Sequence, residues 1–78
     1  MRYVLDAAKM QTKSAAHVHL KETLGLPEYY GGNLDALYDC LTEMLDVEIE
    51  VQNLKDENPY LQRVIKVMKT AGAEVKVI

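Results

Sequence analysis

The side chains best suited to chemistry gather near the middle of the chain. Asp35, Asp39 and Glu43 follow one another at intervals of four residues, and Tyr38 and Thr42 lie between them. Because an α-helix makes one turn every 3.6 residues, this spacing places all five side chains on one side of a helix. Neighbouring carboxylates of this kind could act as an acid–base pair in hydrolysis, or could present negative charge to a cationic partner.

Catalysis is the weaker of these interpretations, because an exposed helix face has no cleft that would desolvate one carboxyl group and raise its pKa. A solvated face opposite a row of leucines is a simpler interpretation, in which Asp35 complements the helix dipole. Two features favour a binding surface. Asp35 and Asp39 repel each other, and no Lys or Arg occurs between Glu22 and Val51. Tyrosine-rich surfaces are also typical of binding sites, and Tyr29 and Tyr30 stand in the segment just before the helix.

Other residues with chemical potential give weaker signals. His17 and His19 are two positions apart, which on a helix directs them to nearly opposite sides, so a shared metal ion is not expected. Cys40 has no histidine at a recognisable spacing and is interpreted as a small buried hydrophobic residue. The pair at 31–32 lacks the Lys-Ser/Thr of a phosphate-binding loop and is expected to shape a turn.

Length and composition limit the class of protein. Seventy-eight residues predict a single domain over 1–78, and one cysteine excludes the internal disulfides that staple small secreted domains. The first ten residues do not resemble a signal peptide, and no apolar run is long enough for a membrane span. A cytoplasmic protein is therefore expected. The net charge of −3 argues against direct binding of nucleic acid, whose phosphates favour basic proteins.

The first half of the chain predicts one strand and two helices. Residues 2–5 favour a strand, and Ser14 is a plausible N-cap for a helix over 15–24 that Gly25 and Pro27 would end. After a loop over 26–32, Asn33 is a second N-cap, for a helix over 34–45. The apolar face of this helix is expected to comprise Leu34, Leu37, Leu41, Met44 and Leu45.

The second half predicts a strand, a helix and a strand. Apolar residues alternate with polar ones over 47–52, which describes a strand buried on one face, and 53–57 are turn-like. Asn58 and Pro59 open a helix that Gly72 would cap, and 73–78 alternate again. The buried stripe of this helix is expected to comprise Leu61, Val64, Ile65 and Met68, and its solvent-exposed face Arg63, Lys66 and Lys69. Strands separated by helices favour parallel pairing, so we predict an α/β fold with a three-stranded parallel sheet and about three helices.

The run LPEYYGGNLDALYDCLT, residues 26–42, resembles the signature segment of the barstar family of intracellular inhibitors of the ribonuclease barnase. The similarity continues in order through the flanking elements to the final KTAGAEVKVI, so it covers most of the chain. It implies a barstar-like fold, no enzymatic activity, and an acidic helix and loop that enter a ribonuclease active site where RNA phosphates would bind. The positions that match the family's binding residues are Tyr29, Asn33, Asp35, Asp39 and Thr42, and Tyr38 stands where the family has a tryptophan.

The chain departs from the family's pattern in three places. The connection between the second strand and the last helix is shorter, which predicts that one helix of the family is missing or reduced. Val67 takes the place of an acidic residue on the last helix, and Met44 replaces a tryptophan. These differences predict weaker binding or a different nuclease.

The sequence therefore predicts a protein inhibitor of a small basic ribonuclease, a role that includes the immunity half of a toxin pair. No cofactor, metal, small-molecule ligand, nucleic acid or membrane is expected as a partner. The alternative is a generic protein-interaction module that kept the fold and lost nuclease binding. The predicted partner-binding residues are Tyr29, Asn33, Asp35, Tyr38, Asp39, Thr42 and Glu43.

Overall fold

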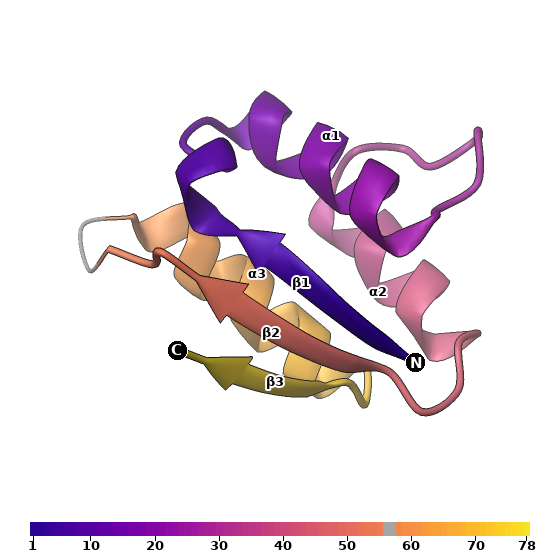
Figure 1. The fold of residues 1–78 in the computed structure, drawn as a ribbon. Coiled ribbons are helices and arrows are strands. Elements are labelled where there is room, and N and C mark those ends of the chain that lie inside the picture. Colours follow the sequence, from indigo (N-terminus) through magenta and orange to yellow (C-terminus); the bar gives the residue numbers. More distant parts are fainter. Residues whose placement is uncertain (56–57) are drawn as a thin grey trace.

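The computed structural model describes residues 1–55 and 58–78. Its elements follow the predicted order, with one short 3₁₀-helix, η1, that the sequence did not predict (Figure 1). In chain order they are β1 (Arg2–Asp6), η1 (Ala7–Lys9), α1 (Lys13–Leu24), α2 (Leu34–Thr42), β2 (Glu48–Gln52), α3 (Pro59–Thr70) and β3 (Glu74–Val77). None of the helices in the described part of the chain is both long and apolar enough to cross a membrane.

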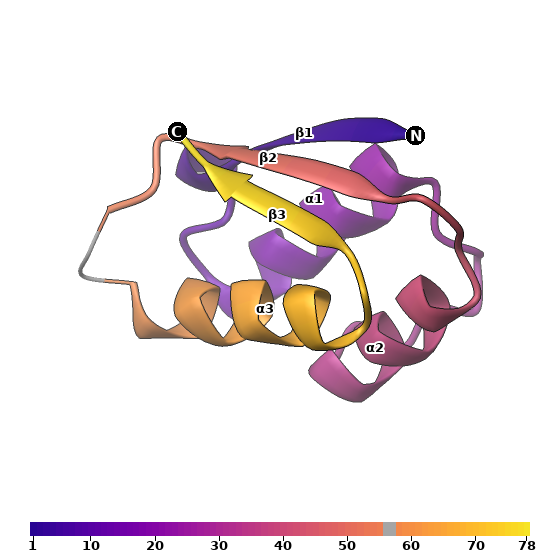
Figure 2. The same ribbon diagram turned by 90° about the horizontal axis from the view of Figure 1, so that it is seen from below.

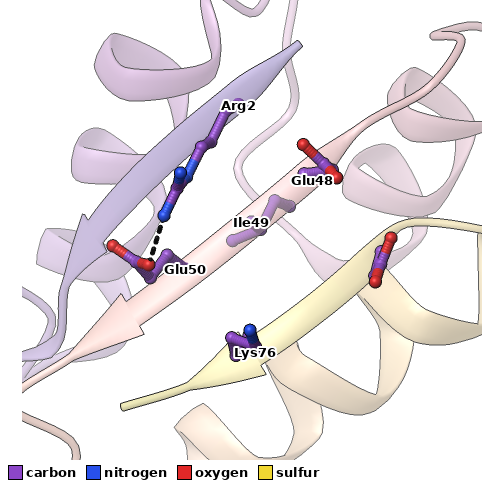
Figure 3. A pocket seen from close by; sticks show the side chains of 6 residues that line it. Arg2, Glu48, Ile49, Glu50 and Lys76 are labelled. Carbon is purple, nitrogen blue, oxygen red and sulfur yellow. Dashed lines mark hydrogen bonds and ion pairs between the residues drawn. The ribbon is translucent and has the colours of Figure 1, made fainter.

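The three strands form one parallel sheet in the order β1-β2-β3, with β2 in the centre. Figure 2 shows that α1, α2 and α3 all cover the same face of this sheet. The strand alternation explains this arrangement, because Leu5, Ile49 and Val51 point inward and are at most 2% exposed. The opposite face is open and charged, and Arg2 and Glu50 form an ion pair across it (Figure 3). The predicted α/β fold with a three-stranded parallel sheet is confirmed.

Helix α1 begins two residues earlier than the sequence predicted. Thr12, not Ser14, is the N-cap, and its side-chain oxygen accepts a hydrogen bond of 3.0 Å from the Ala15 backbone N–H. Both residues can cap a helix, but only Thr12 has the extended backbone that an N-cap needs. Gly25 ends the helix in the left-handed conformation, with φ of 66°, as predicted.

Helix α2 begins as predicted and ends earlier. The Asn33 side chain accepts a hydrogen bond from the Ala36 N–H, which caps the N-terminus. The helix stops at Thr42, so the predicted end at residue 45 is wrong. The last N–H groups, those of Glu43 and Met44, bond to carbonyls three residues back, which tightens the final turn.

The early end of α2 removes one predicted residue from the core. Leu45 was expected on the apolar face of the helix, but it is 84% exposed. Asp46 then adopts a left-handed backbone, with φ of 54°, and its carbonyl accepts a 2.6 Å hydrogen bond from the amino group of Met1. This turn brings Val47 into the core and delivers the chain to the centre of the sheet.

Helix α3 follows the prediction closely. Asn58 caps it, Pro59 occupies its first turn, and its predicted apolar stripe is buried, namely Leu61, Val64, Ile65 and Met68. Thr70 is the last residue of the helix and Ala71 is its C-cap, so Gly72, with φ of 101°, follows the cap and does not form it. Residues 53–55 and 58 contain no helix, in line with the shortened connection, whereas Asp56 and Glu57 of the predicted turn lie outside the described residues.

Candidate functional site

The candidate site is the solvent side of α2. The five side chains predicted to share one helix face do so, and each is exposed; we call Asp35, Tyr38, Asp39, Thr42 and Glu43 the acidic face. Leu37 and Leu41, on the opposite side of the helix, are at most 2% exposed. Burying a leucine contributes roughly 2 kcal/mol, so the core holds the helix in place and the acidic face stays in water.

The carboxylates of the acidic face are not neutralised by ion pairs within the described residues. The two ion pairs found there join Arg2 to Glu50 at 2.7 Å and Lys21 to Glu28 at 3.6 Å. The first lies on the open face of the sheet (Figure 3). The second joins the loop before α2 to α1. Asp35 and Asp39 therefore keep their charge available to a partner.

Two other predicted site residues have backbone roles. The Asn33 side-chain oxygen lies 2.8 Å from the Ala36 nitrogen and caps α2. The Thr42 hydroxyl donates a 2.8 Å hydrogen bond to the Asp39 carbonyl in the last turn. Both side chains thus shape the helix that carries the carboxylates, in addition to any contact with a partner.

The aromatic residues of the site differ in exposure. Tyr29 is 83% exposed in the loop before α2, and Tyr38 is 37% exposed on the helix. Tyr30, next to Tyr29, is half-buried and packs against the core. Between these tyrosines and α2, Gly32 adopts a left-handed backbone, with φ of 67°, which favours glycine.

Buried beneath this loop is a cluster that the sequence did not predict. His17 is only 5% exposed, and its two ring nitrogens contact two tyrosine hydroxyls: Nδ1 lies 2.5 Å from Tyr30 and Nε2 lies 2.6 Å from Tyr60. A neutral imidazole has one N–H and one bare nitrogen, so one tyrosine accepts a hydrogen bond and the other donates one. His17 therefore joins α1, the loop before α2 and the first turn of α3.

Burial changes the acidity of all three members of this cluster. It lowers the pKa of His17, and the nearby Lys13 ammonium lowers that pKa further. It raises the pKa of Tyr30 well above its ordinary range, and it raises the pKa of Tyr60, an effect that the Arg63 cation opposes. The uncharged form of each group is favoured. No sequence signal identifies the cluster, because its tyrosines are 13 and 43 residues away from the histidine.

Two other residues considered in the sequence analysis, His19 and Cys40, have structural roles. His19 is turned away from His17: its Nε2 accepts a 3.0 Å hydrogen bond from the Asp6 N–H. Within the described residues, no group of three or more His, Cys, Asp or Glu side chains is placed to hold a metal ion. Cys40 is half-buried against the core, whereas the sequence predicted a buried residue. Burial raises the pKa of its thiol, and the negative charges of Glu43 and Asp39 raise that pKa further.

Comparison with known proteins accounts for this arrangement. The family model described as "Barstar (barnase inhibitor)" matches residues 1–76. The chain belongs to the barstar family. Barstar-family proteins are inhibitors that bind a ribonuclease and have no enzymatic activity, so the prediction that the chain is not an enzyme is confirmed.

A curated relative supports the same assignment. The chain is 33% identical over 81 residues to a Bacillus subtilis (strain 168) protein named "Putative ribonuclease inhibitor YrdF", and the match covers 96% of this chain and 89% of that one. Val67, one of the predicted departures from the family's pattern, is half-buried and packs against the core. The last helix of this barstar-family chain thus offers an apolar residue at that position.

Proposed function

We propose that the chain inhibits a small basic ribonuclease by inserting the acidic face and the preceding loop into the active site, where they take the place of RNA phosphates. The observation that carries the proposal is the exposure of Asp35, Asp39 and Glu43 on one helix face, with no ion pair to any of them in the described part of the chain. A ribonuclease active site presents cationic side chains that hold phosphates, and such a site is the electrostatic complement of this face.

In this proposal, each part of the surface has a different role. Asp39 lies at the middle of the acidic face, so it is the carboxylate that a surrounding active site would desolvate most completely. Tyr29 and Tyr38 supply aromatic contact area on either side of the helix start. Asn33 and Thr42 hold the two ends of the helix in shape through their backbone hydrogen bonds.

The net charge adds a kinetic effect. A chain with a net charge of −3 is attracted to a basic enzyme before contact, so association is fast and slows as salt is added. The natural target in this proposal is a cognate or endogenous ribonuclease in the cytoplasm, from which the chain protects its own cell.

The test is inhibition of RNA cleavage by barnase and other ribonucleases of its type, with the single variant Asp39→Ala. Truncating one partner of a buried charge pair costs about 2–5 kcal/mol, so the inhibition constant should rise at least about thirtyfold. Glu74→Ala removes another exposed carboxylate, from the sheet and away from the acidic face, and serves as the matched control. Unfolding in urea should show that both variants fold. Equal inhibition by Asp39→Ala and the unmodified chain would refute the proposal.

A further inference from the structure

A polar hollow borders the acidic face on the side of α1 and α3. It has a volume of about 240 Å³, and its lining residues all come from a helix cap or from the first two turns of a helix. They are Lys13, Asn33, Leu34, Asp35, Tyr60 and Arg63. Asp35 belongs both to this hollow and to the acidic face, so a partner that covers the acidic face also covers the hollow.

The charge of the hollow is opposite to that of the acidic face. Lys13 and Arg63 contribute two cations against the single carboxylate of Asp35. Neither cation lies within ion-pair distance of a carboxylate in the regions 1–55 and 58–78. The start of a helix carries additional partial positive charge, which favours an anion. The hollow therefore favours an anionic group and disfavours a basic side chain.

Hydrogen bonds to a buried residue fix one wall of the hollow. The Tyr60 hydroxyl is held 2.6 Å from His17 Nε2, and the other ring nitrogen of His17 holds the hydroxyl of Tyr30, in the loop before α2. The Lys13 ammonium lies 5.8 Å from the centre of the Tyr60 ring, within the range of a cation–π contact. The Tyr60 ring thus has a fixed position before any partner arrives, which reduces the entropy that this wall loses on binding.

We propose that this hollow is a second part of the nuclease-binding surface and that it receives a carboxylate side chain of the ribonuclease. The inference rests on the function proposed above and specifies the partner further: its surface carries an acidic residue beside the cationic active site. Alternating charges on the two surfaces would also set the register of the complex, because a shift would place like charges together.

The proposal predicts the sign of a charge-reversal effect. If the ribonuclease surface were uniformly basic, Arg63→Glu would make the inhibitor more acidic and would tighten binding. If a carboxylate occupies the hollow, Arg63→Glu weakens binding, because it replaces an attraction with a repulsion. Lys66→Glu is the matched control, since Lys66 is an exposed residue of the same helix that does not line the hollow.

The experiment measures the dissociation constants of the unmodified chain, Arg63→Glu, Lys66→Glu and Asp39→Ala for a panel of barnase-type ribonucleases that includes barnase. For the member bound most tightly, Arg63→Glu should weaken binding about tenfold or more, whereas Lys66→Glu should leave it unchanged or slightly tighter. An Asp→Lys or Glu→Lys variant of that ribonuclease, at the residue facing the hollow, should restore binding to Arg63→Glu.

The outcomes separate the two proposals. Weakening by Asp39→Ala together with unchanged or tighter binding by Arg63→Glu would overturn the carboxylate-binding hollow and leave the inhibitor function intact. Absence of any effect of Asp39→Ala, or absence of binding to every ribonuclease of the panel, would overturn both.

The milder variant Arg63→Gln, which removes the charge without adding a new one, should weaken binding less than Arg63→Glu does. The same weakening by both variants would show that lost packing and not charge is responsible, and would overturn the carboxylate-binding hollow.

Discussion

Nδ1 of His17 lies 2.5 Å from the hydroxyl oxygen of Tyr30, and this contact fastens the loop before α2 to the middle of α1. Tyr30 directly follows Tyr29, which is 83% exposed, so the buried contact determines where the loop presents its exposed aromatic ring. The position of a surface residue proposed to bind the partner thus depends on a histidine that is itself buried.

Removal of the Tyr30 hydroxyl should destabilise the fold. Tyr30→Phe leaves a buried ring nitrogen of His17 without its partner, and a buried unsatisfied polar group costs about 1–3 kcal/mol. Tyr29→Phe removes the same hydroxyl from an exposed ring and should change the free energy of unfolding by less than about 0.5 kcal/mol. Urea denaturation of both variants measures the difference. Equal stability of the two variants would mean that the His17–Tyr30 hydrogen bond contributes nothing.

Stability should fall in mildly acidic solution because of His17. Its pKa is lowered in the folded state by burial and by Lys13, so the unfolded chain binds the proton more readily. The folded protein is therefore fully favoured above the ordinary histidine pKa of about 6.5, and stability decreases as the pH falls below that value. Urea denaturation between pH 8 and pH 5 measures this dependence.

The variant His17→Gln is the control for the pH effect. Glutamine offers an NH₂ donor group and a carbonyl acceptor but does not titrate, so the decline between pH 6.5 and pH 5 should be reduced. Asp6, whose pKa is lowered chiefly by a hydrogen bond from Asn53, also loses stabilisation in acid. That loss begins only near the ordinary aspartate pKa of about 4 and does not overlap this window. An unchanged pH profile of His17→Gln would assign the effect to another group.

The sequence predicted the fold well because local signals were strong and agreed with one another. The alternation around Ile49 marks a strand from nearby residues alone, and the caps Asn33 and Asn58 likewise mark the starts of α2 and α3. The end of α2 depended on distant residues. The helical spacing of apolar residues continues to Leu45, but the chain must turn at Asp46 to place Val47 under the sheet.

The candidate site shows the same division between local and distant information. Exposure of Asp35 and Asp39 follows from helical spacing opposite the leucines, and the structure confirms it. The His17 cluster brings together α1, α3 and the loop before α2, and the cationic hollow brings together the starts of α1, α2 and α3, so spacing within any one helix cannot reveal them. The assignment of the acidic face as the binding surface stays a prediction.

The corrected start of α1 can be tested with two alanine variants. Thr12→Ala removes the side-chain oxygen that accepts from the Ala15 N–H and should cost about 1 kcal/mol. Ser14→Ala places the best helix former at a position inside the helix and should be neutral or slightly stabilising. Thermal unfolding of the two variants gives the comparison. A larger loss of stability for Ser14→Ala than for Thr12→Ala would indicate that Ser14 is the N-cap of α1.

Gly31 and Gly32, the two glycines of the loop before α2, should respond differently to substitution. Gly32 has φ of 67°, and an added Cβ would meet only the His17 Cβ, at 4.0 Å, so the cost comes from backbone strain and not from a clash. Gly32→Ala should therefore destabilise the protein by about 1–2 kcal/mol. Gly31 lacks a positive φ, and its Cβ would make ordinary contacts, so Gly31→Ala should be nearly neutral. Equal losses of unfolding free energy in urea denaturation would show that the left-handed backbone at Gly32 adds no cost to the alanine substitution.

Charge reversal at Asp39 should separate stability from inhibition. Asp35 and Asp39 are one helical turn apart, so they repel each other, whereas Asp39→Lys would create an acidic residue followed by a basic one four positions later. The lysine would also lie nearer the C-terminal end of α2, which has no basic residue in its last turn. Together these effects should raise the free energy of unfolding by about 0.5–1 kcal/mol.

The same variant should lose inhibition, because a cation would then face the cationic active site of the ribonuclease. A gain in stability with loss of inhibition would indicate that the folded chain tolerates the Asp35–Asp39 repulsion for the sake of binding, since the substitution that relieves it removes the function. Thermal unfolding and RNA-cleavage assays of the same preparation measure the two effects. The isosteric Asp39→Asn, which removes the repulsion without adding a cation, should fall between the unmodified chain and Asp39→Lys in both assays. Retained inhibition by Asp39→Lys would place the contact with the ribonuclease elsewhere on the molecule.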